Sequence, residues 1–411
     1  MQQTMTRSMA PVAVAVAALC SFGSVAWAQS NPLSLTVGER VTYDNNFLRA
    51  ADGSPSETTS STTAGVSFAK SLGRQNYSAN LSVNSDKHQS FKNYDFNGYS
   101  GSVGVNSTVG SRGYVSLLHS VSSTQQSPDS QTGLRYNDTI KSNSTSLFTQ
   151  YGVNGRIGVN AQLLRSNTTY SVNTVNDRDS VALRLGANYS PSDLVSFGLG
   201  ARRSDQTVAV TDDKITRYDY DVNTYWAVTG YSSLSAALSL TREQHSLNAL
   251  SGFKGATGSL AWYLTPGGKM SYNLSLNRDN GNSVAGAQYR VTDGQTTSRV
   301  DTTQTTTQLT TSLSGGMNWA ATSKLSTGLR LTFLKFDDAS KSTVTSVFGS
   351  GSSLTPSNGH QFNMNVSVNY LPTRWLNLGC AVDTYDRKGD RLSVKGYKGE
   401  IFSCNAQFTL N

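Results

Sequence analysis

The sequence has 411 residues, of which 36% are hydrophobic and 15% charged, and its formal net charge is +8. Beyond the first residues, no stretch approaches the roughly twenty consecutive apolar residues that a membrane helix needs, so a helical membrane protein is excluded. The basic residues are dispersed and form no cluster or stripe, which excludes nucleic acid as a partner. The chain is therefore either soluble or crosses a membrane with strands.

The N-terminus has the pattern of a secretory signal peptide. Arg7 gives the positive start, Ala10–Leu19 is the apolar run, and Ala26–Ala28 is a small-x-small cleavage site. We therefore expect residues 1–28 to be removed and residues 29–411 to form a single exported domain. Without Arg7 that domain has 33 basic and 26 acidic residues, a formal charge of +7.

Alternation of apolar and polar residues predicts strands along the mature chain. From Gln361 to Tyr370 it has no exception, with Phe, Met, Val, Val and Tyr on one face and Gln, Asn, Asn, Ser and Asn on the other. The segments 180–189 and 271–277 show the same pattern. A period of two residues places successive side chains on opposite faces, as expected for a strand between an apolar and an aqueous phase.

Short and long breaks between the strands take turns. The long ones are rich in Gly, Ser, Thr, Asp and Asn and lie at about 44–58, 86–95, 124–139, 168–176, 206–214, 244–252, 280–303, 337–358 and 386–396. Nine hairpins predict about 18 strands, within a range of 16–18. The expected fold is all-β, a transmembrane antiparallel up-and-down β-barrel with short periplasmic turns and long extracellular loops. A soluble sandwich or a β-solenoid is the alternative. A sandwich rarely has so many hairpins with alternating short and long links, and a solenoid should show a fixed-length repeat, which is not found.

Aromatic residues support the membrane interpretation. Trp226, Trp262, Trp319 and Trp375 each lie beside a short break, and aromatic side chains collect where hydrocarbon meets water. We interpret these four tryptophans as an aromatic girdle at the short-turn rim.

The two cysteines of the mature domain, Cys380 and Cys404, lie almost opposite each other in the final hairpin. Both share a face with lipid-facing residues. An oxidising compartment would permit a disulfide between them. Two reduced thiols are the other interpretation, because cross-strand disulfide geometry is demanding.

A barrel of this size encloses an aqueous lumen unless a loop or plug blocks it. Alternation assigns charged and polar residues to its wall, among them Arg184, Arg202, Arg217, Asp219, Asp221, Asn223, Tyr225, Arg330, Asn363, Asn365 and Asp383. Such a wall suits a hydrated polymer such as a polysaccharide, and equally water and salts. These charges can also simply be solvated or paired with one another.

No catalytic pattern emerges from the sequence. The histidines His88, His119, His245 and His360 are scattered without metal-ligand spacing, and there is no nucleophile-elbow or phosphate-loop signature. We therefore expect no enzyme, no metal and no cofactor.

The run Tyr43-Asp44-Asn45-Asn46-Phe47-Leu48-Arg49, preceded by Leu33-Ser34-Leu35-Thr36-Val37, resembles the opening of outer-membrane barrel proteins encoded with exopolysaccharide biosynthesis genes. The resemblance extends to the signal peptide, about 18 strands and the lack of a plug domain. It implies an outer-membrane pore that exports exopolysaccharide, together with a synthesis machine of the inner membrane and a periplasmic polysaccharide-export protein.

Two other functions stay open. A general or sugar-selective porin would pass small solutes without dedicated partners, although the third loop, with only Asp129 and Asp138 as acids, gives no strong constriction signal. A surface adhesin would bind ligands with its loops and not conduct. The positive charge also predicts an attraction for anionic solutes or for lipopolysaccharide, beside contact with outer-membrane lipid.

Overall fold

The computed structural model describes the backbone of residues 32–410, apart from 128–134, 136, 154, 210–211, 247–251, 294–295, 347–348 and 390–395. Side chains are described for the same residues except 281–307 and 338–357. The predicted signal peptide, 1–28, lies outside the described residues. None of the helices in the described part is both long and apolar enough to span a membrane.

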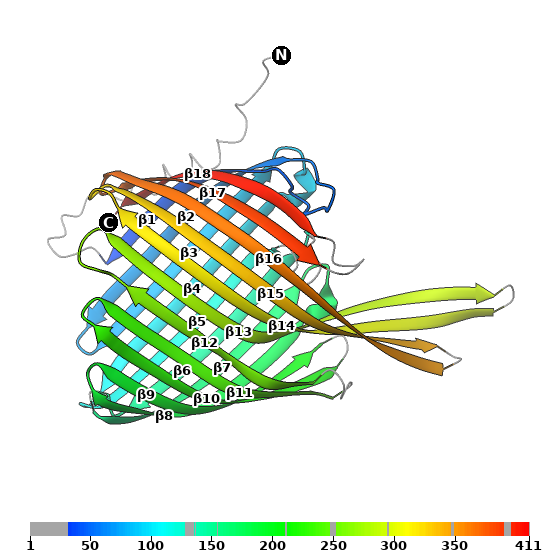
Figure 1. Cartoon of the computed structure of the whole chain (residues 1–411), viewed down its shortest axis with the longest axis horizontal. Coiled ribbons are helices and arrows are strands. Elements are labelled where there is room, and N and C mark those ends of the chain that lie inside the picture. Colours follow the sequence, from blue (N-terminus) through cyan, green and yellow to red (C-terminus); the bar gives the residue numbers. More distant parts are fainter. Residues whose placement is uncertain are drawn as a thin grey trace, which may run out of the picture.

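Eighteen antiparallel strands form one closed sheet (Figure 1). The strands are β1 Leu33–Asp44, β2 Glu57–Leu72, β3 Gln75–His88, β4 Phe96–Val109, β5 Gly113–Gln125, β6 Thr139–Tyr151, β7 Ile157–Tyr170, β8 Arg178–Ser192, β9 Val195–Val208, β10 Asp213–Thr229, β11 Ser232–His245, β12 Phe253–Leu264, β13 Met270–Asp293, β14 Thr296–Ala320, β15 Leu325–Ser346, β16 Gly349–Thr373, β17 Leu376–Gly389 and β18 Tyr397–Leu410. Two short 3₁₀ helices, η1 Lys92–Tyr94 and η2 Thr174–Asn176, lie in loops. The predicted all-β barrel of 18 strands is confirmed.

Pairing of the first strand with the last closes the barrel. β1 and β18 are in register from Leu35 opposite Leu410 to Asp44 opposite Ile401. Closure gives every strand a hydrogen-bonded neighbour on each side, which is the condition a sheet must meet to span a bilayer. Every other strand pairs with its neighbours in the sequence, so the topology is up-and-down.

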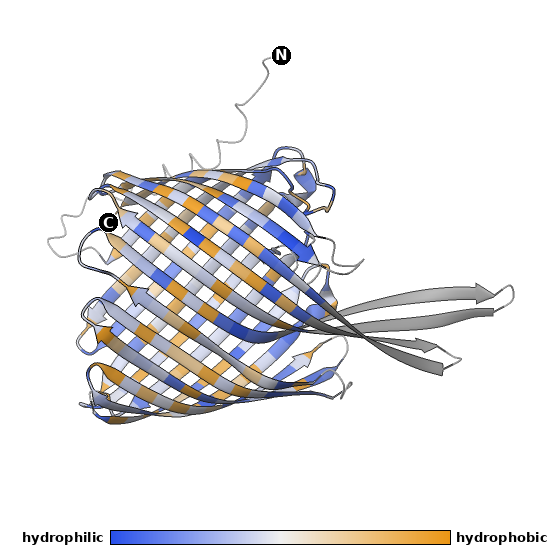
Figure 2. Cartoon of the chain, viewed as in Figure 1, coloured by the Kyte–Doolittle hydropathy of each residue, from blue (hydrophilic) through white to orange (hydrophobic). Residues whose placement is uncertain are grey.

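The two faces of the sheet differ in polarity (Figure 2). On β8, Val181, Leu183, Leu185 and Tyr189 are 46–56% exposed on the outer face, while Arg184 and Asn188 belong to the inner face. An apolar outside around a polar inside is the construction of an outer-membrane barrel, and the protein belongs to the outer membrane.

The two ends of the barrel carry links of different length. At one end, links of two to five residues join the strands, for example 73–74 and 321–324. The other end carries the longer links, including L1 (45–56), L2 (89–95), L3 (126–138) and L4 (171–177). Short turns face the periplasm in this class of barrel, so L1 to L4 are extracellular.

The prediction that 280–303 and 337–358 are loops is wrong, because both segments are largely strand. β13 pairs with β14 up to Asp293 opposite Thr296, and β15 pairs with β16 up to Ser346 opposite Gly349. These four strands have 22 to 25 residues, and Figure 1 shows both hairpins running on beyond the extracellular rim. They project away from the barrel instead of covering its mouth. Outside the membrane a hairpin needs no apolar face, so its sequence resembles that of a loop.

Candidate functional site

Charged residues of the inner wall lie on β8, β9 and β10, and the first group joins β8 to β10. Arg184 donates from Nη2 to Asp221 Oδ2 at 2.5 Å and from Nη1 to Asn160 Oδ1 at 3.2 Å. The ion pair passes over Gly200 of the intervening strand. A Cβ atom at Gly200 would lie 2.6 Å from Arg184 Nη2 and 2.7 Å from Asp221 Oδ2. A larger side chain at this position would therefore displace the ends of Arg184 and Asp221 from this arrangement.

A second group of charges is centred on Asp219. Its Oδ2 accepts from Arg202 Nη2 at 2.7 Å, and its Oδ1 accepts from Arg217 Nε at 3.0 Å and from the Thr241 hydroxyl at 2.7 Å. Arg217 also donates from Nη2 to Asp279 Oδ1 at 3.0 Å. Asp219 is buried, but the Arg202 and Asp279 side chains are 43% and 58% exposed, so a solute in the lumen would meet one charge of each sign.

Of the eight charged or aromatic residues predicted to line the lumen, the structure brings five together, namely Arg184, Arg202, Arg217, Asp219 and Asp221. The sequence placed them on one wall, but it did not show which charges pair. Pairing depends on how β8, β9 and β10 are offset along each other. That offset is a property of barrel closure and is not visible in the period of one strand.

The other three predicted lumen residues lie elsewhere. Arg330 and Asp383 are both opposite Asn365 in the strand register, and Asn365 Nδ2 donates to Asp383 Oδ1 at 2.6 Å. This is a separate polar row on β15, β16 and β17. Tyr225 is 46% exposed near the periplasmic end, beside a hollow of about 640 Å³ that Asn188 also lines. In the part of the chain that the structure describes, none of the three forms a hydrogen bond or ion pair with the charges on β8 to β10.

Hydroxyl and amide groups cover the inner wall of β2 to β6. A shallow hollow of about 340 Å³ there is lined mainly by small polar side chains, namely Thr36, Ser67, Asn80, Ser82, Ser100, Ser102, Ser120, Ser122, Ser142 and Ser144. Ser82 and Ser100 share a hydrogen bond of 2.7 Å. The side chains that line this hollow donate and accept hydrogen bonds, and none of them is charged.

The extracellular mouth contains a buried network built from the motif at 43–49. Asp44 accepts from Arg49 Nη1 at 2.7 and 2.8 Å, and both residues are at most 6% exposed. Asn46 donates from Nδ2 to the carbonyl oxygens of Ala50 at 2.9 Å and Lys398 at 3.0 Å. Arg49 has φ of 62°, a left-handed conformation that is uncommon for a residue with a side chain. L1 is thus folded tightly on itself and bonded to β18.

Phe47 joins L1 to the next two loops. Its ring is 3% exposed, stacks on Phe91 at 5.1 Å between centroids, and meets Tyr94 edge-on at 5.2 Å. Arg135 of L3 lies 4.4 Å above the same ring and donates from Nε to the Phe47 carbonyl oxygen at 2.9 Å. Phe47 of L1 therefore packs against L2 and against Arg135 at the extracellular rim (Figure 1). The sequence singled out this motif but assigned it no contacts, because loop packing leaves no periodic signal.

Two buried carboxylates hold extracellular loops by accepting hydrogen bonds from their backbone amides. Glu57, at the start of β2, holds L2, and Asp138, at the end of L3, holds L4. Glu57, 1% exposed, accepts from the backbone amides of Ser90 and Phe91 at 3.0–3.1 Å. Asp138 accepts from the Ser171 hydroxyl at 2.8 Å and from the amides of Val172 and Asn173 at 2.9 Å. Burial alone would raise the pKa of Asp138, but these hydrogen bonds to the charged form outweigh it and the pKa lies below its ordinary value.

The four predicted girdle tryptophans all lie near the short-turn rim. Trp226, Trp319 and Trp375 are 44–46% exposed, and Trp375 stacks on Phe408 at 5.6 Å. Trp262 donates from Nε1 to the Ser232 hydroxyl at 2.9 Å. Each ring thus has an apolar body toward the outside and lies close to the strand ends, as an interfacial aromatic does.

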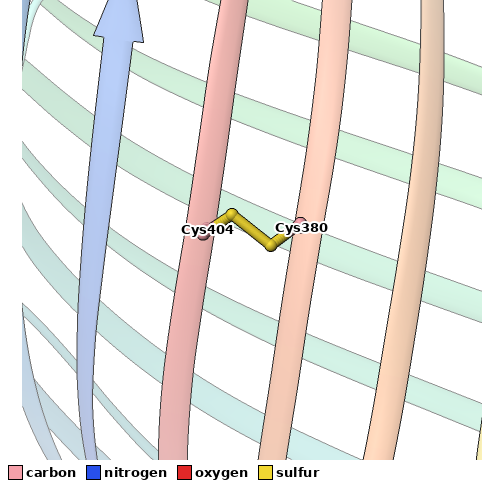
Figure 3. The surroundings of a disulfide bond; sticks show 2 residues. All are labelled: Cys380 and Cys404. Atoms are coloured by element: carbon pink, nitrogen blue, oxygen red, sulfur yellow. A yellow bond between two sulfur atoms is a disulfide. The ribbon is translucent and has the colours of Figure 1, made fainter.

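Cys380 and Cys404 are bonded to each other across β17 and β18 (Figure 3). They are direct partners in the strand register, and their Cα atoms are 4.1 Å apart. Val368 and Val41, their neighbours on the flanking strands, are 42% and 49% exposed, so the disulfide lies on the outer face.

The carboxylate of Glu39 lies on the outer face of the barrel among apolar side chains. Glu39 lies halfway along β1, on the same face as Val37 and Val41, opposite Ala406. Its two oxygens accept from the hydroxyls of Ser60, a short hydrogen bond, and Thr62, at 2.6 Å. An ionisable group at this depth needs partners, and both hydroxyls come from the neighbouring strand β2.

Within the described part of the chain, no group of three or more His, Cys, Asp or Glu residues is arranged to hold a metal ion. The chemistry that this lumen offers is therefore hydrogen bonding and paired charges along a polar wall.

No protein-family model matches the chain, and no curated protein matches it. Solved structures similar to it are outer-membrane proteins. The outer membrane protein OpdK from Pseudomonas aeruginosa is 11% identical with a TM-score of 0.44, over 92% of this chain and 98% of that one. OccD1 (OprD) is 12% identical with a TM-score of 0.45, over 92% and 95%. The siderophore receptor PirA from Pseudomonas aeruginosa is 11% identical with a TM-score of 0.43, over 94% and 81%. Likenesses this distant assign the chain to no family.

Proposed function

We propose that the protein is an outer-membrane channel that passes hydrated polar solutes, with saccharides as the best-fitting class. The observation that carries the proposal is the hydrogen-bonding hollow on the inner wall of β2 to β6, which is lined by uncharged side chains and faces the lumen of a closed barrel. Serine hydroxyls and asparagine amides both donate and accept hydrogen bonds, as sugar hydroxyls do. A sugar that replaces its hydrogen bonds to water with bonds to this wall therefore loses little free energy.

The paired charges on β8 to β10 support a neutral or weakly charged solute. Arg184 is neutralised by Asp221, and Arg202 and Arg217 share Asp219. A wall built to attract a strongly charged solute would leave charges of one sign unpaired. Asp279, which pairs with Arg217, balances the partly exposed Arg202, so the three arginines of these two groups face three carboxylates.

Export of exopolysaccharide is the second candidate and the more specific one. It is favoured by the resemblance of residues 43–49 to the opening of barrels encoded with exopolysaccharide genes. In the structure this motif organises the extracellular mouth, through which an exported polymer would leave. A periplasmic polysaccharide-export protein would be the partner in that case, and the same wall would guide the polymer.

Reconstitution tests the channel itself. Liposomes with the purified full chain should swell in neutral sugars, at rates that fall with sugar size, whereas a protein without a passage leaves them unchanged. Deletion of the gene in its host, with polysaccharide quantified outside the cell and in the periplasm, then separates the two candidates. Export function predicts loss outside the cell, restored by the intact gene. A diffusion channel predicts normal polysaccharide and slower sugar uptake.

A further inference from the structure

Three basic residues lie together on the outer face near the extracellular end of β10, β11 and β12. Lys214, Arg242 and Lys254 are exposed and line one hollow of about 540 Å³. Arg242 shares its face with Leu238 and Leu240, which are 59% and 65% exposed to the membrane side. The three cations therefore face away from the lumen.

Two of the cations oppose each other directly. Arg242 and Lys254 are partners in the strand register, so their Cβ atoms are about 5 Å apart, a spacing at which like charges destabilise a sheet. Among the residues that the structure describes, no carboxylate lies within ion-pair distance of Arg242, Lys254 or Lys214. An anion bound between them would remove the repulsion.

Two carboxylates close to the group in the sheet have other partners. Glu243, which also lines the hollow, accepts from His245 Nε2 and Asn280 Nδ2 at 3.3 Å each. Asp205, on the outer face of β9, pairs with Arg203 at 2.9 Å and accepts from the Thr216 hydroxyl at 3.0 Å. Neither Glu243 nor Asp205 therefore forms an ion pair with Lys214, Arg242 or Lys254.

The height of the group matches the headgroup layer of the outer leaflet. Arg242 is in the same row as Tyr218, and the next outer-face row toward the membrane contains Tyr220 and Leu240, both more than 60% exposed. Lys214 lies four residues further out than Tyr218, about 13 Å along the strand. The cations therefore begin where the apolar belt ends and continue outward.

We propose that Lys214, Arg242 and Lys254 form a binding site for the phosphate groups of a phosphorylated glycolipid of the outer leaflet. Arg242 and Lys254 hold one phosphate between them, since guanidinium and ammonium groups form charge-assisted hydrogen bonds with phosphate oxygens. Lys214 reaches a second phosphate or a charged sugar above it. The apolar surface of Leu238 and Leu240 below accommodates acyl chains. The site is independent of what passes through the lumen.

The test is lipid binding to the folded full chain in detergent, measured by native mass spectrometry with diphosphorylated lipid A as the probe. The triple variant K214Q/R242Q/K254Q should bind about 100-fold more weakly, since each basic residue at an anionic lipid surface contributes roughly fivefold. The matched control K70Q/R112Q/R156Q removes the same charge from exposed residues near the periplasmic rim and should bind like the unmodified protein. Charge-preserving K214R/R242K/K254R should keep binding, and heat-modifiable migration checks that every variant is folded.

Four results would overturn the site. Equal loss in the periplasmic control would show a general charge effect. Equal binding of dephosphorylated lipid A would remove phosphate from the recognition. Full displacement of lipid A by millimolar inorganic phosphate would assign the cations to free phosphate. Unchanged binding by the folded glutamine variant would remove the three residues from the interaction.

Discussion

Arg49 and Tyr385, which are 336 residues apart in the sequence, contact each other at the extracellular mouth. The Arg49 guanidinium carbon lies 4.1 Å from the centre of the Tyr385 ring, and Nη1 donates to the tyrosine hydroxyl oxygen at 2.6 Å. The same Nη1 bonds Asp44 at the end of β1. One side chain of L1 therefore connects the first strand with β17, and the barrel must close before this contact can form.

Replacement of Arg49 by alanine should destabilise the mouth. It removes the nearer of the two cations beside buried Asp44, since Arg135 Nη2 remains 3.9 Å from Asp44 Oδ2, and loss of one partner of a buried pair costs about 3 kcal/mol. We expect a lower free energy of unfolding in urea and faster protease cleavage within 45–56 of the folded barrel. Arg203→Ala is the control, because its pair with Asp205 is exposed and contributes less than about 1 kcal/mol. Equal effects of the two substitutions would contradict the structural role of Arg49.

The sequence predicted the strands, faces and loops well, because a membrane barrel imposes a period of two on each strand and polar links between them. It could not predict the contact between Arg49 and Tyr385, since loop residues follow no period and their partners are distant in the chain. It also mistook 280–303 and 337–358 for loops, because hairpins outside the bilayer lack the apolar face that identified the other strands.

Loss of the Asp219 carboxylate should shift ion selectivity toward anions. In Asp219→Asn, Arg202 and Arg217 lose the carboxylate that they share, which leaves positive charge on the lumen wall. The ratio of anion to cation permeability, from reversal potentials in planar bilayers under a salt gradient, should rise roughly twofold or more. Asp205→Asn makes the same charge change on the outer face and should not alter the ratio. If both variants behave alike, the charges on β10 do not face the permeating ions.

The anchoring of L4 by Asp138 should depend on pH. Because the pKa of Asp138 is lower in the folded protein than its ordinary value of about 3.9, its stabilising effect is complete above that pH and is lost as the pH falls through the lowered pKa. Hydrogen exchange at the amides of Val172 and Asn173, corrected for the intrinsic pH dependence of exchange, should lose protection under acid. Asp138→Asn has no charge to lose and should show weaker protection that stays constant with pH. Constant protection in the unmodified protein would refute this explanation.

The disulfide should stabilise the closing hairpin. It links residues 24 apart, a loop for which cross-linking contributes about 3 kcal/mol. The variant Cys380→Ser/Cys404→Ser should unfold at a lower urea concentration while its channel conductance is unchanged, because the bond lies on the outer face. Mass spectrometry of unreduced peptides checks the bond directly. Two free thiols in the protein isolated from the outer membrane would refute the disulfide.

The carboxylate of Glu39 offers a test of what a polar group on the lipid face needs. Its oxygens depend on the hydroxyls of Ser60 and Thr62, so Ser60→Ala/Thr62→Val leaves a carboxylate without partners on that face and should lower the free energy of unfolding by about 1–3 kcal/mol. Adding Glu39→Leu should recover most of the loss, since replacing all members of a buried polar group by apolar ones is nearly neutral. Glu39→Leu alone should lower the free energy of unfolding less than the hydroxyl variant, because the two hydroxyls can bond backbone carbonyls.

Urea unfolding in lipid vesicles measures the free energy of unfolding of the unmodified protein and of all three variants. If Glu39→Leu gives no recovery in the variant that lacks the hydroxyls, the loss comes from packing between β1 and β2, and the carboxylate is not what the hydroxyls satisfy.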